Sequence, residues 1–189
     1  MPSKKHYIIT SITLGCIAMA SAVLIGATNL LTAPRIKVNE DNRFNVGITS
    51  VFGDGAEATV YEESLKDFKI QGFKSDFNIE LESSYEVKNE ENNIHGWAIR
   101  TTGRNDYGKV SLIVGFDYEP RSFKGIYVIS NEQTYASTLV EEYIDPLNGA
   151  EDKETKMEDV SCGATYGAKL TRDMIKAAKE YVDGMQGWD

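Results

Sequence analysis

Cysteine and histidine are scarce in this chain of 189 residues, with two of each. Cys16 lies in an apolar segment and Cys162 lies near the other end of the chain, so no disulfide within the chain is expected. His6 and His95 are also far apart, and no group of histidines and cysteines has the spacing of metal ligands. These absences argue against a disulfide scaffold, a zinc site and a haem site.

Basic charge is also low. The chain has 20 lysines and arginines against 29 aspartates and glutamates. Lys4 and Lys5 precede the apolar segment, so the chain after that segment has 18 basic and 29 acidic residues, a net charge of −11. A domain with this charge repels nucleic acid and anionic lipid headgroups, so nucleic acid is not expected as a partner.

Charged residues are missing altogether from residues 7–33. An apolar run of about 20 residues is long enough to cross a bilayer, so we predict a transmembrane helix over residues 7–33, surrounded by membrane lipid. Because Lys4 and Lys5 precede it, the positive-inside rule keeps residues 1–6 in the cytoplasm. The sequence thus predicts a single-pass protein of the cell membrane, with residues 34–189 forming an extracytoplasmic domain.

Two other interpretations of the apolar segment stay open. Ala20-Ser21-Ala22 is typical of a signal-peptide cleavage site, although apolar residues continue past it to Leu31. Gly15-Cys16 is typical of lipid attachment, although Thr13 stands where such a site needs leucine. We expect a retained helix and keep cleavage and lipidation as alternatives.

Hydrophobic periodicity indicates an α+β domain. Apolar residues at helical spacing predict an amphipathic helix over residues 35–52, ended by Gly53-Asp54-Gly55. Alternating apolar residues and turn signals predict an antiparallel meander of four strands, over residues 83–88, 94–101, 109–118 and 123–130. Helices over 134–144 and 171–185 would cover this sheet, and polar residues 149–158 between them indicate a loop.

The stretch before the last predicted helix carries the chemistry. It reads Asp159-Val160-Ser161-Cys162-Gly163-Ala164-Thr165. Gly163 can take a positive φ and Ala164 adds little bulk, so a large planar group can approach the backbone. Thr165 would place its hydroxyl beside the free N–H groups of a helix start, where a phosphate is favoured. The alternative on these residues is that Thr165 merely caps the helix.

This stretch resembles the flavinylation motif of the FMN-binding domain family, in which an acidic residue precedes Ser/Thr-Gly-Ala-Thr and the last threonine bears FMN through a phosphoester. The family includes the G component of the Rnf electron-transport complex and the C component of the sodium-pumping NADH:quinone oxidoreductase. Both have one N-terminal transmembrane helix and an exported domain. The likeness extends, in patches, to residues 29–34, 96–99, 103–109 and 112–117.

The resemblance implies that a flavin transferase attaches FMN covalently to Thr165, and that Asp159 serves in recognition. Asp159 is as readily explained as a turn residue. The motif neighbours and three tyrosines are the expected surroundings of the flavin: Ser161, Cys162, Gly163, Ala164, Tyr166, Tyr107 and Tyr135. Tyr107, Tyr135 and Tyr166 offer aromatic faces for the isoalloxazine ring, with ordinary core or surface packing as the alternative.

The same resemblance implies an electron-carrying subunit of an Rnf-type complex, which couples ferredoxin and NAD to ion transport and has other membrane subunits as partners. The sequence has no nucleophile–base pair and no dinucleotide fingerprint, so we expect no catalytic residues and no independent turnover. The alternatives are a free-standing anchored flavoprotein for extracellular electron transfer and a flavin-free anchored adaptor.

The chain departs from the family pattern in three places. Cys162 stands where the family usually has serine or threonine, and a thiol is the weaker hydrogen-bonding group. Tyr166-Gly167-Ala168 replaces the hydroxyl residues that often follow the motif. Residues 132–137, Glu-Gln-Thr-Tyr-Ala-Ser, stand where related subunits carry Glu-Thr-Pro-Gly-Leu-Gly near the flavin. The family's loop closure over the ring is therefore the feature least transferable to this chain.

Overall fold

The computed structural model describes residues 4–185, and it describes only the backbone of residues 4–10, 34–38 and 40. Residues 1–3 of the expected cytoplasmic segment lie outside this range. The chain divides into two compact units between Asn42 and Arg43. Each unit is described separately below.

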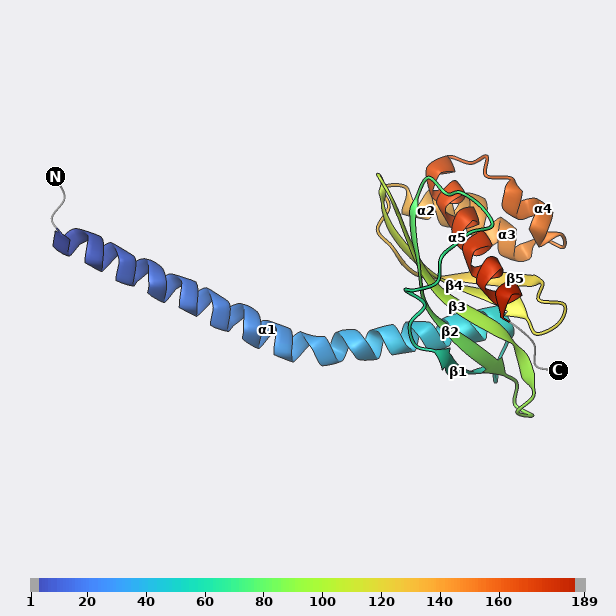
Figure 1. The fold of residues 1–189 in the computed structure, drawn as a ribbon, viewed down its shortest axis with the longest axis horizontal. Helices are drawn as coiled ribbons and strands as arrows, with labels where there is room; N and C mark the ends of the chain where they lie inside the picture. Colours follow the sequence, from blue (N-terminus) through green and yellow to red (C-terminus); the bar gives the residue numbers. More distant parts are fainter. Residues whose placement is uncertain (1–3, 186–189) are drawn as a thin grey trace. The chain divides into compact units, whose positions relative to one another are not determined.

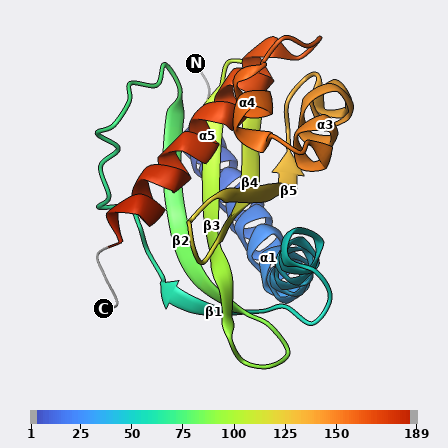
Figure 2. The ribbon, with the colours of Figure 1, turned by 90° about the vertical axis from the view of Figure 1, so that its right-hand side faces the viewer.

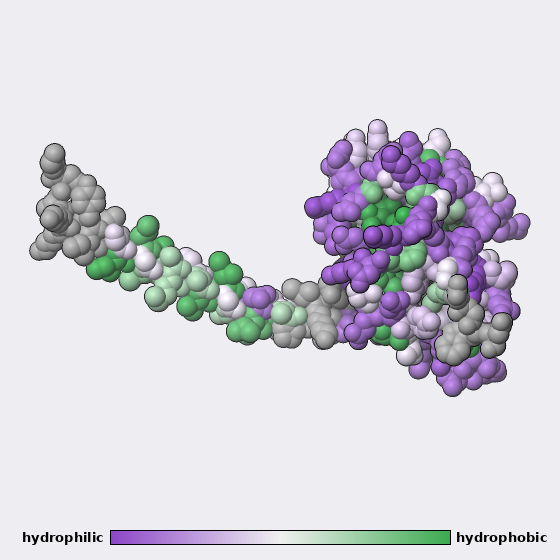
Figure 3. Space-filling view, viewed as in Figure 1, coloured by the Kyte–Doolittle hydropathy of each residue, from purple (hydrophilic) through white to green (hydrophobic). Residues whose placement is uncertain are grey.

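The first unit is helical. The helix α1 runs over Lys4–Phe52, so its last turns belong to the second unit. Within it, Ser11–Ala33 is apolar and long enough to cross a membrane once, and none of its side chains is covered by protein (Figure 3). The predicted 35–52 helix is thus the continuation of the first one, through Pro34. The predicted stop is confirmed, since Gly53 has a φ of +97° and its N–H donates to the Thr49 carbonyl at 2.8 Å.

The second unit contains a five-stranded antiparallel sheet (Figure 1). Its strands follow one another in chain order: β1 (Glu57–Glu62), β2 (Asn78–Lys88), β3 (Ile94–Asn105), β4 (Gly108–Asp117) and β5 (Phe123–Asn131). The four predicted strands are confirmed, with β2 and β3 longer than expected. The edge strand β1 was not predicted, because it is exposed along nearly its whole length and lacks the alternation that identifies a half-buried strand.

The helices after the sheet differ more from expectation. The predicted 134–144 helix is a chain of short pieces: α2 (Ala136–Leu139), the π-helical turn η1 (Val140–Ile144) and α3 (Asp145–Gly149). The predicted loop over 149–158 is wrong in its second half, which forms α4 (Lys153–Glu158). Asp152 starts that helix by accepting the Thr155 N–H at 3.0 Å. The last helix, α5 (Thr165–Gly184), begins six residues earlier than its apolar stripe indicated.

Helices cover both faces of the sheet. The helix α5 crosses the face formed by β2, β3 and β4 (Figure 2), where the predicted stripes of β4 and α5 pack together as the main core. The last turns of α1 cover the other face, where Ile48 and Phe52 are buried against Ala98 and Ile113. Gly47 permits this approach, because a Cβ there would lie 2.7 Å from the Tyr127 ring.

We expect Gly96→Ala to destabilise the domain by about 1–3 kcal/mol, the usual cost of overpacking a well-filled core. A Cβ on Gly96 would collide with the backbone carbonyl of Phe116 on the neighbouring strand and approach the Phe52 ring at 2.7 Å. Denaturant unfolding of the full chain in detergent measures the loss. Gly149→Ala is the control, since a Cβ there meets nothing within 4 Å, and an equal loss in both variants would contradict the expectation.

Candidate functional site

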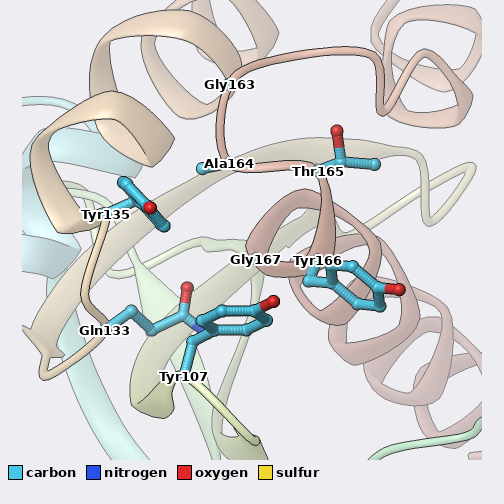
Figure 4. A pocket seen from close by; sticks show the side chains of 8 residues that line it. All are labelled: Tyr107, Gln133, Tyr135, Gly163, Ala164, Thr165, Tyr166 and Gly167. Carbon is cyan, nitrogen blue, oxygen red and sulfur yellow. The ribbon is translucent and has the colours of Figure 1, made fainter.

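A cavity of about 220 Å³ lies at the N-terminal end of α5 (Figure 4). Its wall combines three segments that are far apart in the sequence: the β3–β4 turn, the segment after β5, and the start of α5. The lining residues are Tyr107, Gln133, Tyr135, Gly163, Ala164, Thr165, Tyr166 and Gly167. The structure therefore brings together six of the eight residues expected around the flavin and adds Gln133 and Gly167.

Backbone hydrogen bonds hold the first two segments side by side. The N–H of Glu132 donates to the Lys109 carbonyl at 2.8 Å, and the N–H of Thr134 donates to the Tyr107 carbonyl at 3.1 Å. Gly108, with a φ of +137°, has no side chain to collide with the Glu132 backbone. The sheet thus extends its pairing past β5 and places Tyr107 beside residues 133–135.

The turn before α5 is fixed by hydrogen bonds to its own backbone and to η1. The Thr165 hydroxyl donates to the Cys162 carbonyl at 2.6 Å, and the Gly163 N–H donates to Oε2 of Glu142 at 2.7 Å. Ala164 is the N-cap residue and Thr165 is the first residue of the helix. The alternative that Thr165 serves as the N-cap is therefore wrong, because its hydroxyl points back to the turn instead of accepting an N–H of α5.

Gly163 has a different structural role in this turn from the positive φ that the sequence predicted. Gly163 does not take a positive φ. It is instead a point of close approach, because a Cβ there would lie 2.9 Å from Cγ2 of Thr138 and 3.3 Å from Oε2 of Glu142. Gly167 acts similarly, since a Cβ would collide with Oε1 of Gln133 and lie 3.1 Å from Leu139. Both glycines let α2 and η1 pack directly against the start of α5.

The start of α5 offers free donors to the cavity. The N–H groups of Thr165, Tyr166 and Gly167 have no hydrogen-bond partner among the described residues, as expected for the first turn of a helix. The helix dipole adds a partial positive charge at the same end. An anionic group placed beside Thr165 would therefore be stabilised by both effects.

The three tyrosines form an exposed aromatic cluster around the cavity. Tyr107, Tyr135 and Tyr166 are 43%, 54% and 57% exposed. The Tyr107 ring centroid lies 5.6 Å from that of Tyr166 and 6.4 Å from that of Tyr135, which is contact distance for aromatic pairs. A planar ligand between two rings needs about 7 Å, two contacts of about 3.5 Å each. Such a ligand therefore stacks on an exposed ring face and does not insert between Tyr107 and Tyr166.

Gln133 is the polar side chain buried in the cavity wall. It is 7% exposed, and its Nε2 has no hydrogen-bond partner among the described residues. A buried donor without a partner costs about 1–3 kcal/mol, so it calls for an explanation. Sequence reasoning missed Gln133 as a lining residue; the only signal was its place in residues 132–137, the segment that departs from the family pattern.

Three expected site residues lie outside the cavity lining. Cys162 is half-buried and packs against the main core, and Ser161 is exposed. Asp159 is fully exposed, and hydrogen bonds from the Lys156 ammonium and the Ser161 N–H hold the pKa of its carboxyl below the ordinary value. Asp159 thus presents an ionised carboxylate at the surface, six residues before Thr165 in the sequence.

Tyr143 links the turn to the core. It is fully buried on η1, burial raises the pKa of its hydroxyl, and that hydroxyl donates to the Met157 carbonyl at 2.7 Å. The contact joins η1 to the end of α4, from which the chain leads into the 159–164 turn.

We expect Tyr143→Phe to destabilise the domain by about 1–3 kcal/mol, because the buried Met157 carbonyl loses its donor. Urea unfolding of the full chain measures the change. Tyr127→Phe is the matched control, since the Tyr127 hydroxyl has no hydrogen bond within residues 4–185, and we expect a change within about 0.5 kcal/mol. Equal effects of the two substitutions would show that the Tyr143 hydroxyl contributes nothing.

Comparison with known proteins identifies only the N-terminal part of the chain. No curated protein matches the chain, whereas residues 1–43 match the family model described as the RnfG N-terminal region. This match ends at Arg43, the first residue of the second unit, and includes none of the residues that line the cavity. The chain thus begins with an RnfG-like N-terminal region that carries one apolar helix long enough to span a membrane.

Proposed function

We propose that this protein carries FMN covalently on Thr165 and serves as the electron-carrying RnfG component of an Rnf-type membrane complex. The observation that carries the proposal is the position of Thr165. It is the first residue of α5 and shares one cavity with three tyrosines that come from separate parts of the chain. The RnfG-like N-terminal region supports the assignment to the complex.

The phosphate of the cofactor would lie at the start of α5. An ester at Thr165 Oγ places the phosphate beside the N–H groups of residues 165–167, which have no other partner among the described residues. Esterification removes the hydroxyl proton that now bonds the Cys162 carbonyl. The carboxylate of Glu142 opposes the phosphate charge, but it is exposed, so water and salt weaken the repulsion.

The isoalloxazine ring would lie against the tyrosines. The cavity of about 220 Å³ is smaller than the 300 Å³ or more typical of sites that enclose a ligand of this size. The ring would therefore stay partly exposed, stacked on a tyrosine face. FMN supplies one- and two-electron transfer, and an exposed ring edge suits exchange with neighbouring carriers.

Attachment of FMN to Thr165 would require a separate enzyme. A flavin transferase, aided by a divalent metal, would direct Thr165 Oγ to the FMN phosphorus of FAD. The new O–P bond replaces the bond between the two FAD phosphates, AMP leaves, and the threonine proton is released. The exposed carboxylate of Asp159 is the residue we assign to recognition by that enzyme. A covalent bond prevents loss of the cofactor outside the cytoplasm, where the positive-inside rule places this domain.

We expect Thr165→Ala to abolish covalent flavin, because alanine has no oxygen to esterify. The chain, co-expressed with a flavin transferase, is separated under denaturing conditions and read by in-gel flavin fluorescence and by mass. The wild type should gain the mass of FMN less one water. Thr134→Ala is the control, since Thr134 is exposed and lies outside the cavity lining. Fluorescence that survives in Thr165→Ala would rule out this attachment site.

We further expect the tagged full chain, extracted gently from its native membrane, to bring down other integral-membrane subunits. The match of residues 1–43 to the RnfG N-terminal region is the basis of this expectation. Replacing the apolar helix with an unrelated single-pass helix should reduce this recovery without removing flavin from Thr165. A flavin-bearing chain recovered alone would favour the free-standing anchored flavoprotein instead, and an unmodified chain would favour the flavin-free adaptor.

A further inference from the structure

The peptide unit between Cys162 and Gly163 is hydrogen-bonded at both ends. Its carbonyl oxygen accepts the Thr165 hydroxyl at 2.6 Å, and its N–H donates to Oε2 of Glu142 at 2.7 Å. Because a peptide unit is planar and conjugated, these two contacts are joined through one rigid group. A chain of two hydrogen bonds therefore runs from the Glu142 carboxylate, through this peptide unit, to the hydroxyl of the proposed attachment residue.

The Glu142 side chain is exposed, but its backbone is anchored. Glu142 belongs to η1, where the next two residues, Tyr143 and Ile144, are buried in the main core. Both carboxylate oxygens lie close to the turn before α5, since a Cβ on Gly163 would stand 3.3 Å from Oε2 and 3.7 Å from Oε1. The hydrogen bond itself has the short length expected for a bond to an ionised acceptor. The carboxylate thus has a defined place beside the turn.

The effect of this chain on Thr165 follows from its polarity. Hydrogen bonds in a chain polarise one another, so a carboxylate at the N–H end makes the carbonyl at the other end a stronger acceptor. A stronger acceptor draws the Thr165 proton toward the Cys162 oxygen, which leaves more negative charge on Oγ. The bond also fixes the rotation of the hydroxyl, and no group among the described residues donates to Oγ. The lone pairs of Oγ are therefore free to face an incoming phosphorus atom.

We propose that Glu142 is a positioning residue for flavin attachment and acts on Thr165 through the peptide unit between Cys162 and Gly163. This inference rests on the proposed function. During attachment Oγ of Thr165 forms the new O–P bond, and the bond between the two phosphates of FAD breaks. AMP leaves with the electron pair of that bond, and the threonine proton passes to a base of the transferase or to water. Glu142 forms no bond to FAD; it orients Oγ and raises its negative charge before the attack.

Two other roles of this carboxylate predict different kinetics. A negative charge near the attachment site repels the phosphates of FAD, so repulsion alone predicts that removal of the charge speeds attachment. Direct contact with the transferase predicts weaker binding of the chain at an unchanged maximal rate. Positioning of Thr165 predicts a slower maximal rate at unchanged binding. The sign of the effect and the kinetic constant that changes therefore decide among the three.

The test uses full-length chains expressed without a flavin transferase and purified in detergent. Each chain is incubated with purified flavin transferase, FAD and Mg²⁺, and covalent FMN is followed over time by in-gel fluorescence. We expect Glu142→Gln to lower kcat about 3-fold, because the amide oxygen keeps the hydrogen bond but loses the charge that strengthens it. We expect Glu142→Ala to lower kcat about 10-fold, because the peptide N–H then has no acceptor. The KM values for the chain and for FAD should stay within about twofold.

Glu141 supplies the matched controls. It is the neighbouring residue on η1, it is exposed, and it has no hydrogen bond or ion pair among the described residues. Glu141→Gln and Glu141→Ala should therefore leave kcat unchanged. The thermal midpoint of each flavin-free chain is measured as well, and a loss of kcat in Glu142→Gln at an unchanged midpoint separates positioning from a merely structural role. If Glu142→Ala fails to fold, the kcat of Glu142→Gln decides.

The outcomes distinguish the two proposals. Wild type that gains no FMN overturns the proposed function, and the role of Glu142 falls with it. Wild type that gains FMN, with Glu142→Gln as fast or faster, overturns the role of Glu142 and leaves the proposed function standing. A higher KM for the chain at an unchanged kcat does the same. A lower kcat in both Glu142 variants, with unchanged KM and with the Glu141 variants like wild type, supports both proposals.

Discussion

The packing of α5 on the sheet is the contact on which the rest of this domain depends. Leu170 and Met174 are fully buried, and each contributes about 1.5–3 kcal/mol by leaving water. They lie directly over Gly103 of β3, where a Cβ would approach their side chains to 2.7 Å and 2.6 Å. This close fit holds α5 against β3. The first turn of α5 therefore lies beside the β3–β4 turn, and Thr165 reaches the same cavity as Tyr107.

The cavity at the start of α5 depends on close contacts between backbone segments at three glycines. Gly108, Gly163 and Gly167 each lack a side chain where another segment packs, so three loops converge within one cavity. The convergence leaves polar groups unsatisfied: the N–H groups at the start of α5 and the Gln133 amide. Such groups are costly when they have no partner. Under the proposed function, the FMN phosphate would accept hydrogen bonds from the N–H groups at the start of α5.

Several elements were predictable because their signal is local. The strict alternation of Val110, Leu112, Val114 and Phe116 reflects a strand buried on one side by α5, and all four side chains lie in the main core. The end of α1 was predictable because Gly53, which has no side chain, can take the positive φ that ends a helix. By contrast, the sequence predicted a loop where α4 forms, because its six residues are mostly polar and show no helical spacing of apolar residues. The helix is stabilised by the Asp152 N-cap and by the burial of Met157. The exposed edge strand β1 was not predicted for a similar reason, since pairing with β2 defines it.

The sequence by itself determined the apolar helix, the acidic domain and the meander, which depend on composition and on short-range periodicity. The candidate role of Thr165 rests instead on the resemblance of residues 159–165 to a flavinylation motif. Only the tertiary structure decided which residues share the cavity. It brought Tyr107, Tyr135 and Tyr166 together, left Cys162 and Ser161 outside the lining, and added Gln133. The reason is that these positions depend on how closely backbones approach one another, and that distance is set by glycines and packed side chains from distant parts of the chain.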